Sequence, residues 1–126
     1  MIFWLLACSP TLTPDTLPPC GGAPNCVTSQ EGDAAHTVPP LPVASPAALR
    51  EAVLSLPGCV VVSETERWLH AACTTPSGLF TDDLLVLRLG DLLHVRSASR
   101  VGYSDLGVNR ERVEALRVVL DPEAPT

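Results

Sequence analysis

Residues 94–116 read HVRSASRVGYSDLGVNRERVEAL, and the rest of the chain is organised around this stretch. Its beginning is typical of a β-strand, its middle of a loop rich in glycine and serine, and its end of an amphipathic helix. Polar side chains are crowded in it, and no reaction follows from them alone. The candidates for a site are His94, Arg96, Ser97, Ser99, Arg100, Tyr103, Asp105, Asn109 and Arg110.

Upstream of this stretch, the sequence predicts a helix that starts at Ser45-Pro46. Serine can cap the free backbone amides of a helix, and proline is favoured at the first helical position. Apolar residues then recur with helical spacing, which gives one buried face. This face comprises Leu49, Val53 and Leu56, and Pro57-Gly58 ends the helix.

Between the two helical segments, the alternation of apolar and polar residues predicts four strands. They are expected at residues 59–63, 68–74, 79–89 and 92–98, with a two-residue turn at Gly90-Asp91. If Glu64 pairs with Trp68, then Cys59 lies opposite Cys73. That register puts Cys59, Val61, Leu69, Ala71 and Cys73 on one face and Trp68, His70 and Ala72 on the other.

A second helix follows the polar loop, with Val113, Leu116 and Leu120 as its apolar stripe. Its start is left open, because Ser104, Asp105 and Asn109 are all acceptable caps. The predicted fold is therefore a two-layer α+β domain with the order helix, four antiparallel strands, helix, and with both helices on one sheet face. This domain covers residues 20–122, residues 123–126 form a tail, and the proline-rich N-terminal third is irregular.

The charge of the chain argues against a nucleic-acid-binding protein. The formal net charge is −6, and a general nucleic-acid binder needs a basic face. All eight basic residues are arginine, and six of them lie in residues 88–117 together with only four carboxylates. The positive potential is therefore local.

The N-terminus, MIFWLLAC, resembles the signal of bacterial lipoproteins, in which leucine stands three positions before the acylated cysteine. The resemblance implies cleavage after Ala7 and lipidation of Cys8, with palmitate among the usual acyl chains. No basic residue precedes the short apolar run, and a start codon further upstream would explain this departure from the lipoprotein pattern. The alternative to a lipoprotein signal is a frayed apolar terminus. Residues 9–19 are a Pro/Thr-rich, solvated tether. We expect export and membrane anchoring in a bacterial cell envelope.

Five cysteines minus a lipidated Cys8 leave an even number, as an oxidised exported domain requires. Five residues separate Cys20 from Cys26, which is wrong for a zinc knuckle and for a CxxC redox pair. A small disulfide-closed loop is the simplest interpretation, and no metal or other cofactor is expected. Cys59 and Cys73 form the second predicted disulfide, although two buried thiols fit the same positions.

Two motifs resemble those of a bacterial and plastid family catalogued as "domain of unknown function 1499". They are PNCVTSQ at residues 24–30 and HVRSASRVGYSDLGVNR at residues 94–110, and the likeness covers residues 20–120. The resemblance implies a small exported or membrane-associated protein. It offers no agreed activity and no catalytic residues. Position 73 departs from the family pattern, since the family favours an aromatic residue where this chain has Cys73.

Three interpretations of the central stretch remain open. Its polar residues can brace the junction between strand and helix, with an Arg–Asp105 ion pair at its centre and Arg112 exposed on the helix. They can bind an anion or a peptide, because guanidinium groups beside hydroxyls suit carboxylates and phosphates. They can also form a small hydrolase that uses Ser97, Ser99 or Ser104 with His94 and Asp105.

The hydrolase is the weakest of the three interpretations, because no GxSxG motif is present and His94 and Ser97 point to opposite faces of a regular strand. Asp82-Asp83 is interpreted as a solvated strand end rather than a metal site, since neighbouring strand residues point apart. We expect a non-catalytic binding or accessory module. Its expected partners are the membrane, through the lipid anchor, and an envelope protein or a small anionic ligand.

Overall fold

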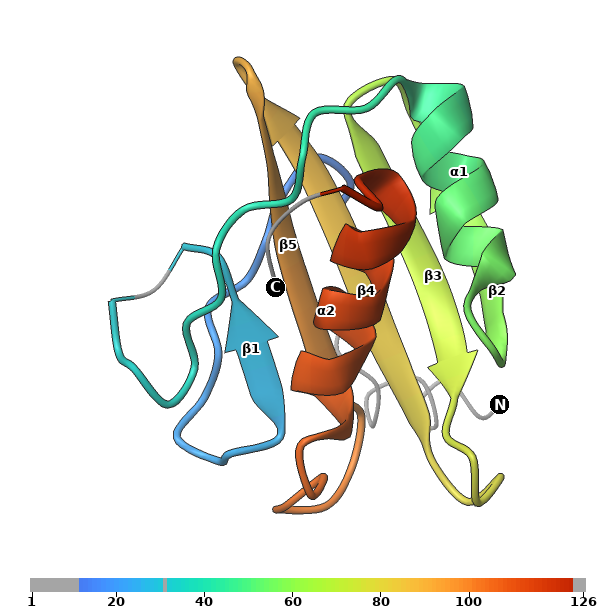
Figure 1. Ribbon diagram of the computed structural model, residues 1–126. Helices are drawn as coiled ribbons and strands as arrows, with labels where there is room; N and C mark the ends of the chain where they lie inside the picture. The colour runs from blue at the N-terminus through green and yellow to red at the C-terminus, as the bar shows by residue number, and fades with distance from the viewer. Residues whose placement is uncertain (1–11, 31, 124–126) are drawn as a thin grey trace, which may run out of the picture.

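The computed structural model describes residues 12–30 and 32–123, so that the predicted lipidation site Cys8 lies outside the described part. The fold is α+β, with two helices on one face of a five-stranded antiparallel sheet (Figure 1). The strand order is β1-β5-β4-β3-β2. The elements are β1 (Cys26–Thr28), α1 (Pro46–Ser55), β2 (Cys59–Glu64), β3 (Trp68–Thr74), β4 (Thr81–Leu89), β5 (Leu92–Ser99) and α2 (Val108–Leu120).

The prediction of four strands is wrong, because β1 adds a fifth at the edge of the sheet. Cys26 pairs with Ala98 and Thr28 with Arg96 in antiparallel register. A strand of three residues is too short to show an alternating pattern, and all three of its residues are buried. Its pairing with β5 therefore depends on tertiary contacts that the local sequence does not reveal.

The pairing of β2 with β3 follows the predicted register only in its first half. Cys59 lies opposite Cys73 and Val61 opposite Ala71, as expected. A register shift between Val61 and Ser63 then places Glu64 opposite Leu69 rather than Trp68. A bulge of this kind adds one residue to one strand and bends it.

The Cys59–Cys73 disulfide is confirmed, with the two Cα atoms 4.0 Å apart at the buried end of β2. Gly58 precedes this bridge at φ +77°, and a Cβ atom there would lie 2.5 Å from the carbonyl oxygen of Thr74. Glycine therefore lets the chain enter β2 beside the end of β3.

The main core lies between the sheet and the two helices. Ser45 caps α1 by accepting a hydrogen bond from the Ala48 amide, and Pro46 occupies the first turn, as predicted. The predicted stripe of α1 is buried, and the stripe of α2 packs on the same core, with Leu120 at its margin. The prediction that both helices cover one sheet face is confirmed (Figure 1).

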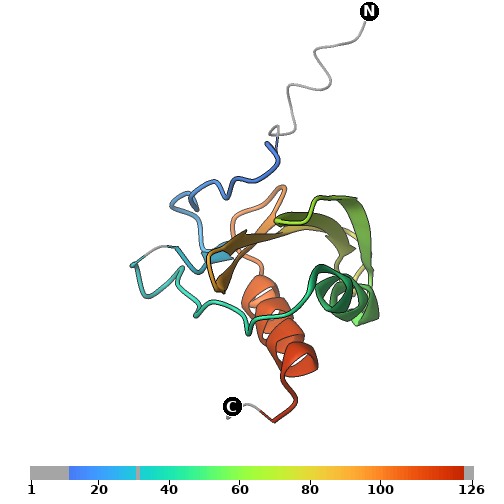
Figure 2. The same ribbon diagram turned by 90° about the horizontal axis from the view of Figure 1, so that it is seen from above.

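The opposite face of the sheet is covered in part by the N-terminal segment, which lies on the other side of the sheet from α2 (Figure 2). Leu12 and Leu17 pack against a small cluster of Trp68, Leu85 and Leu87. The indole Nε1 of Trp68 donates a hydrogen bond to the Thr16 carbonyl at 3.1 Å. The described part of the expected tether is therefore attached to the sheet.

Candidate functional site

Asp105 organises the start of α2, but it pairs with backbone amides and an amide side chain rather than with an arginine. Its carboxylate accepts hydrogen bonds from the amides of Gly107 at 2.8 Å and Asn109 at 3.0 Å, and from Asn109 Nδ2 at 2.7 Å. Burial alone would raise the pKa of Asp105, but these hydrogen bonds hold it below its usual value. The predicted Arg–Asp105 ion pair is therefore wrong, whereas its role at the helix start is supported.

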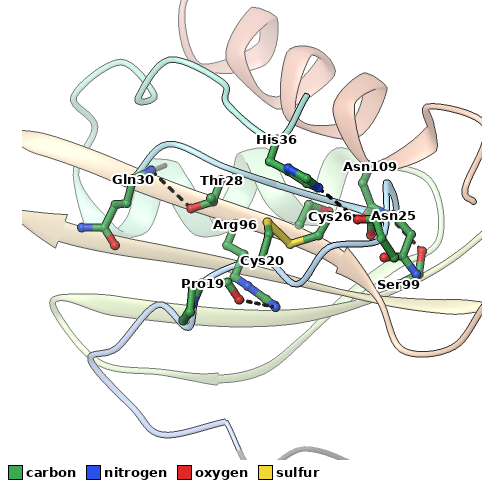
Figure 3. The surroundings of a disulfide bond; sticks show 12 residues. Pro19, Cys20, Asn25, Cys26, Thr28, Gln30, His36, Arg96, Ser99 and Asn109 are labelled. Carbon is green, nitrogen blue, oxygen red and sulfur yellow. Dashed lines mark hydrogen bonds between the residues drawn. A yellow bond between two sulfur atoms is a disulfide. The ribbon is translucent and has the colours of Figure 1, made fainter. Parts of the chain in front are cut away.

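Asn109 is completely buried and joins β5, α2 and the residues before β1. Its Nδ2 group lies within hydrogen-bonding distance of Ser99 Oγ at 3.0 Å and of the Asn25 carbonyl at 3.2 Å (Figure 3). Its Oδ1 accepts a hydrogen bond of 2.6 Å from Ser97 Oγ. Ser97, Ser99 and Asn109 therefore form one internal network beneath the first turn of α2.

Arg112 extends this network into the core, so the expectation that it is exposed is wrong. Its Nη1 lies 2.8 Å from Asp82 Oδ2, and its side chain is only 8 % exposed. The same nitrogen donates to Ser97 Oγ and to Asn109 Oδ1. Asp82 is fully buried, so its interpretation as part of a solvated strand end is also wrong. Arg112 neutralises it.

Three other arginines hold the irregular, proline-rich segment before α1 against the domain. Arg110 donates to the carbonyls of Thr37 and Ala35, and Arg117 donates to those of Pro40 and Pro39. Arg88 donates to the Ala44 carbonyl at 2.6 Å. Proline lacks an amide proton and prevents regular pairing, so these carbonyls need side-chain donors. These three arginines therefore stabilise the fold by holding the segment before α1 in place.

The remaining polar candidates on β5 are also engaged internally. Arg96 lies on the sheet face away from the helices, beside the Cys20–Cys26 disulfide, and its Nη2 approaches the Pro19 carbonyl at 3.4 Å (Figure 3). His94 Nδ1 hydrogen-bonds with Ser29 Oγ at 2.9 Å. The Cys20–Cys26 bridge itself is confirmed, with a Cα separation of 5.6 Å.

The parts of the alternative hydrolase are not brought together. His94 is bonded to Ser29, whereas Ser97 is buried on the other side of β5 beneath α2. Asp105 is turned toward the α2 amides. Opposite sides of one strand cannot supply a nucleophile and its base to the same substrate.

The second aspartate of β4 belongs to a cluster on the open face of the sheet. His70 Nε2 lies 2.7 Å from Asp83 Oδ1, and Arg100 bonds both oxygens of the same carboxylate at 2.9 and 3.0 Å. Burial alone would raise the pKa of Asp83, but the hydrogen bonds from His70 and Arg100 lower it to about 2. A cavity of about 350 Å³ beside the cluster is lined by Leu12, Pro14, Val62, Ser63, Trp68, His70, Asp83 and Arg100.

Large apolar side chains are exposed at one end of the sheet, on the β3–β4 and β5–α2 loops at the bottom of Figure 1. We call this surface the apolar tip and define it as Leu79, Phe80, Val101, Tyr103 and Leu106. Leu106 is 90 % exposed and has φ 55°, a conformation that a leucine side chain disfavours. The two loops line a cavity of about 320 Å³ between them.

The apolar tip carries almost no charge. Residues 75–81 read TPSGLFT after Thr74, and residues 101–104 read VGYS, without an acidic or basic side chain. Asp105 is the charged residue that lines the cavity, and its carboxylate is bonded to α2. The tip is therefore a surface of large, exposed apolar side chains on two neighbouring loops.

Sequence reasoning missed the apolar tip, the roles of His70 and Asp83, and the burial of Arg112. A signal for Arg112 was present, because it lies three residues after Asn109 and four before Leu116, on the flank of the buried stripe. A signal for Asp82 was also present, because it lies two residues before the core residue Leu84. No local signal shows that the two loops of the tip meet.

The described residues show neither a candidate metal site nor a helix that could span a membrane. Within residues 12–30 and 32–123, no group of three His, Cys, Asp or Glu side chains is placed to hold a metal ion. No helix in the same ranges has the length and apolar composition needed to cross a membrane. The two disulfides indicate an oxidising, exported location.

Comparison with known proteins gives a family but no activity. No curated protein and no solved structure matches the chain. A family model described as "Protein of unknown function (DUF1499)" matches residues 16–120, which include both motifs of the resemblance and all elements of the sheet and helices. The chain therefore belongs to the family described as protein of unknown function DUF1499.

Proposed function

We propose that the chain is an exported, non-catalytic binding module of the bacterial cell envelope, anchored through lipidated Cys8. The observation that carries the binding role is the contrast between its polar and apolar candidates. Arg96, Asp105, Asn109, Arg110 and their neighbours donate to or accept from other parts of the domain. The apolar tip has large exposed side chains around a cavity.

The exported location is supported by the two disulfides, and the anchor by the spacing of Leu5 and Cys8. Stable anchoring needs two lipid signals, which the lipoprotein modification supplies as several acyl chains on one cysteine. An anchored module close to the membrane can then bind a membrane component or another envelope protein.

Intact mass spectrometry of the membrane fraction tests this anchor. We expect a chain that begins at Cys8, carries acyl chains, and has four oxidised cysteines. The Cys8→Ala variant should leave the membrane-lipoprotein fraction. An unmodified chain that begins at Met1, with four alkylatable cysteines, would contradict both the export and the anchor.

The non-catalytic role is tested with a panel of ester, amide and phosphate-ester substrates. We expect no turnover above that of the denatured protein. Turnover by the folded protein that is lost in His94→Ala or Ser104→Ala, with the unfolding midpoint of each variant preserved, would favour a hydrolase instead.

Binding of a small anion is a second candidate function, favoured by Arg100. Its side chain is 40 % exposed beside the cavity of the open face, although Asp83 already occupies part of its hydrogen-bonding capacity. Titration with phosphate and acetate, followed by NMR, should move resonances of Arg100 and His70 if this site is used. Equal shifts in an Arg100→Gln variant would exclude it.

A further inference from the structure

We infer that the apolar tip inserts into the lipid bilayer to which the chain is anchored, so that the module lies directly on the membrane surface. This inference rests on the proposed function and names the partner of the same surface. Two independent observations lead to it: the short length of chain between the anchor and the sheet, and the pairing of both charged residues that flank the tip.

The chain between the proposed anchor and the sheet is short. Leu12 packs against the open face of the sheet and lines the same cavity as Arg100, the residue directly before the Val101 of the tip. Four residue steps separate Cys8 from Leu12, which span at most about 14 Å when fully extended. A domain of this size has a radius of gyration of about 13 Å. The domain therefore cannot move away from the bilayer by even its own diameter.

The two ends of the sheet differ in the charged residues beside their exposed apolar side chains. The loop at the opposite end of the sheet, between β4 and β5, also exposes apolar residues, Leu89 and Leu92, but Arg88 and Asp91 lie beside them. Two charged residues, Arg100 and Asp105, flank the tip, but Arg100 is paired with Asp83 and Asp105 is bonded to α2. Inserting a charge into the hydrocarbon region is costly, so the tip, whose flanking charges are paired, suits lipid better than the β4–β5 end, where Asp91 is exposed.

The kinds of side chain on the tip also suit the interface of a bilayer. Leu79, Phe80 and Leu106 are large and apolar, and Tyr103 has an apolar ring with a polar hydroxyl, which favours the level of the headgroups. The net charge of −6 opposes attraction to anionic lipids. Binding should therefore depend on apolar contact and only weakly on salt.

Vesicle co-sedimentation tests this inference with the full chain carrying Cys8→Ser, both disulfides intact, and phosphatidylcholine vesicles. Phe80→Ser combined with Leu106→Ser should lower the partition coefficient about 10-fold or more, because each apolar side chain contributes to insertion. Leu89→Ser combined with Leu92→Ser is the matched control, and it should bind as its parent does. All of these positions are exposed, so the unfolding midpoints should agree.

Fluorescence quenching by brominated phosphatidylcholine locates the contact. Leu106→Trp should be quenched beyond the signal that Trp4 and Trp68 give in the parent protein, whereas Leu92→Trp should not. Equal partition of the two double variants, equal quenching of the two tryptophan variants, or binding that requires anionic lipid would overturn the inference. If Cys8 is not acylated in cells, the proposed anchor is wrong, but a positive vesicle result still supports insertion of the tip. A failure of the proposed function and a failure of this inference are therefore distinguishable.

Discussion

Asp82 and Asp83 are neighbours in β4, but they lie on opposite faces of the sheet. Asp82 lies under α2, where Arg112 neutralises it, and no hydrogen bond of good geometry reaches either of its oxygens in the described residues. Asp83 lies on the open face, where His70 and Arg100 both bond it and Arg100 remains partly exposed. Two neighbouring aspartates therefore lie in different environments, one enclosed in the core and the other beside the surface of the open face.

The difference teaches where this domain can bind a partner. On the helix-covered face, polar groups are enclosed by the core and hold the junction of β5 with α2. On the open face and at the apolar tip, side chains reach the surface and cavities form between loops. We therefore expect substitutions on the first face to change stability, and substitutions at the tip to change binding.

The largest loss of stability is expected for Arg112→Ala. This change leaves Asp82 buried and unpaired, and breaking a buried ion pair by removing one partner costs about 3–5 kcal/mol. Urea unfolding measures the change in the free energy of unfolding. The matched control is Arg50→Ala on α1, whose pair with Glu64 is exposed and should contribute less than about 1 kcal/mol.

A double variant sharpens this prediction. Arg112→Ala combined with Asp82→Ala removes both charges, so it should be more stable than Arg112→Ala alone. If Arg112→Ala and Arg50→Ala have equal stability, the Arg112–Asp82 pair does not stabilise the core of the helix-covered face as described.

A smaller loss is expected for Asp105→Ala. The change removes the acceptor for two backbone amides at the start of α2 and for the Asn109 side chain, and should cost about 1–2 kcal/mol. Asp105→Asn keeps one acceptor oxygen and should lose less. Thermal unfolding of the three proteins compares them, and identical midpoints would contradict the role of Asp105 in starting the helix.

The open face should show its contribution as a dependence on pH. The pKa of Asp83 is about 2 in the folded protein, below its unfolded value of 3.8. A carboxyl group with a lowered folded pKa stabilises the protein above its unfolded pKa, and this stability is lost as the pH falls from about 4 to about 2. Denaturant unfolding across this range should show a shallower decline for Asp83→Asn. Parallel declines for both proteins would contradict the ion pairing of Asp83.

The sequence alone was enough to predict the helices and strands whose apolar residues recur with a clear period. The stripes of the two helices, the hairpins around β3 and β4, and the Cys59–Cys73 pair follow from spacing alone. β1 was missed because three residues carry no period, and the bulge after Val61 because a shift of one residue leaves the local composition unchanged.

The candidate site was harder to predict, because only some of its polar residues are partners of one another. Asn109 joins Ser97, Ser99 and Asp105 in one network, whereas the arginines among the candidates bond elsewhere. Arg96 and Arg110 donate to carbonyls of residues far away in the chain, which local spacing cannot indicate. The apolar tip joins loops that follow β3 and β5, so it exists only after the sheet has formed. Exposed leucines in a sequence resemble core residues until the fold is known.

Photo-crosslinking in the native envelope tests the central claim most directly, namely that the polar residues serve the fold while the apolar tip meets the partner. A photoreactive amino acid replaces Leu106 at the tip in one protein and Leu92 at the opposite end of the sheet in another. We expect lipid adducts at position 106 and few at position 92. Equal yields at the two positions, or adducts at position 92 alone, would contradict the account.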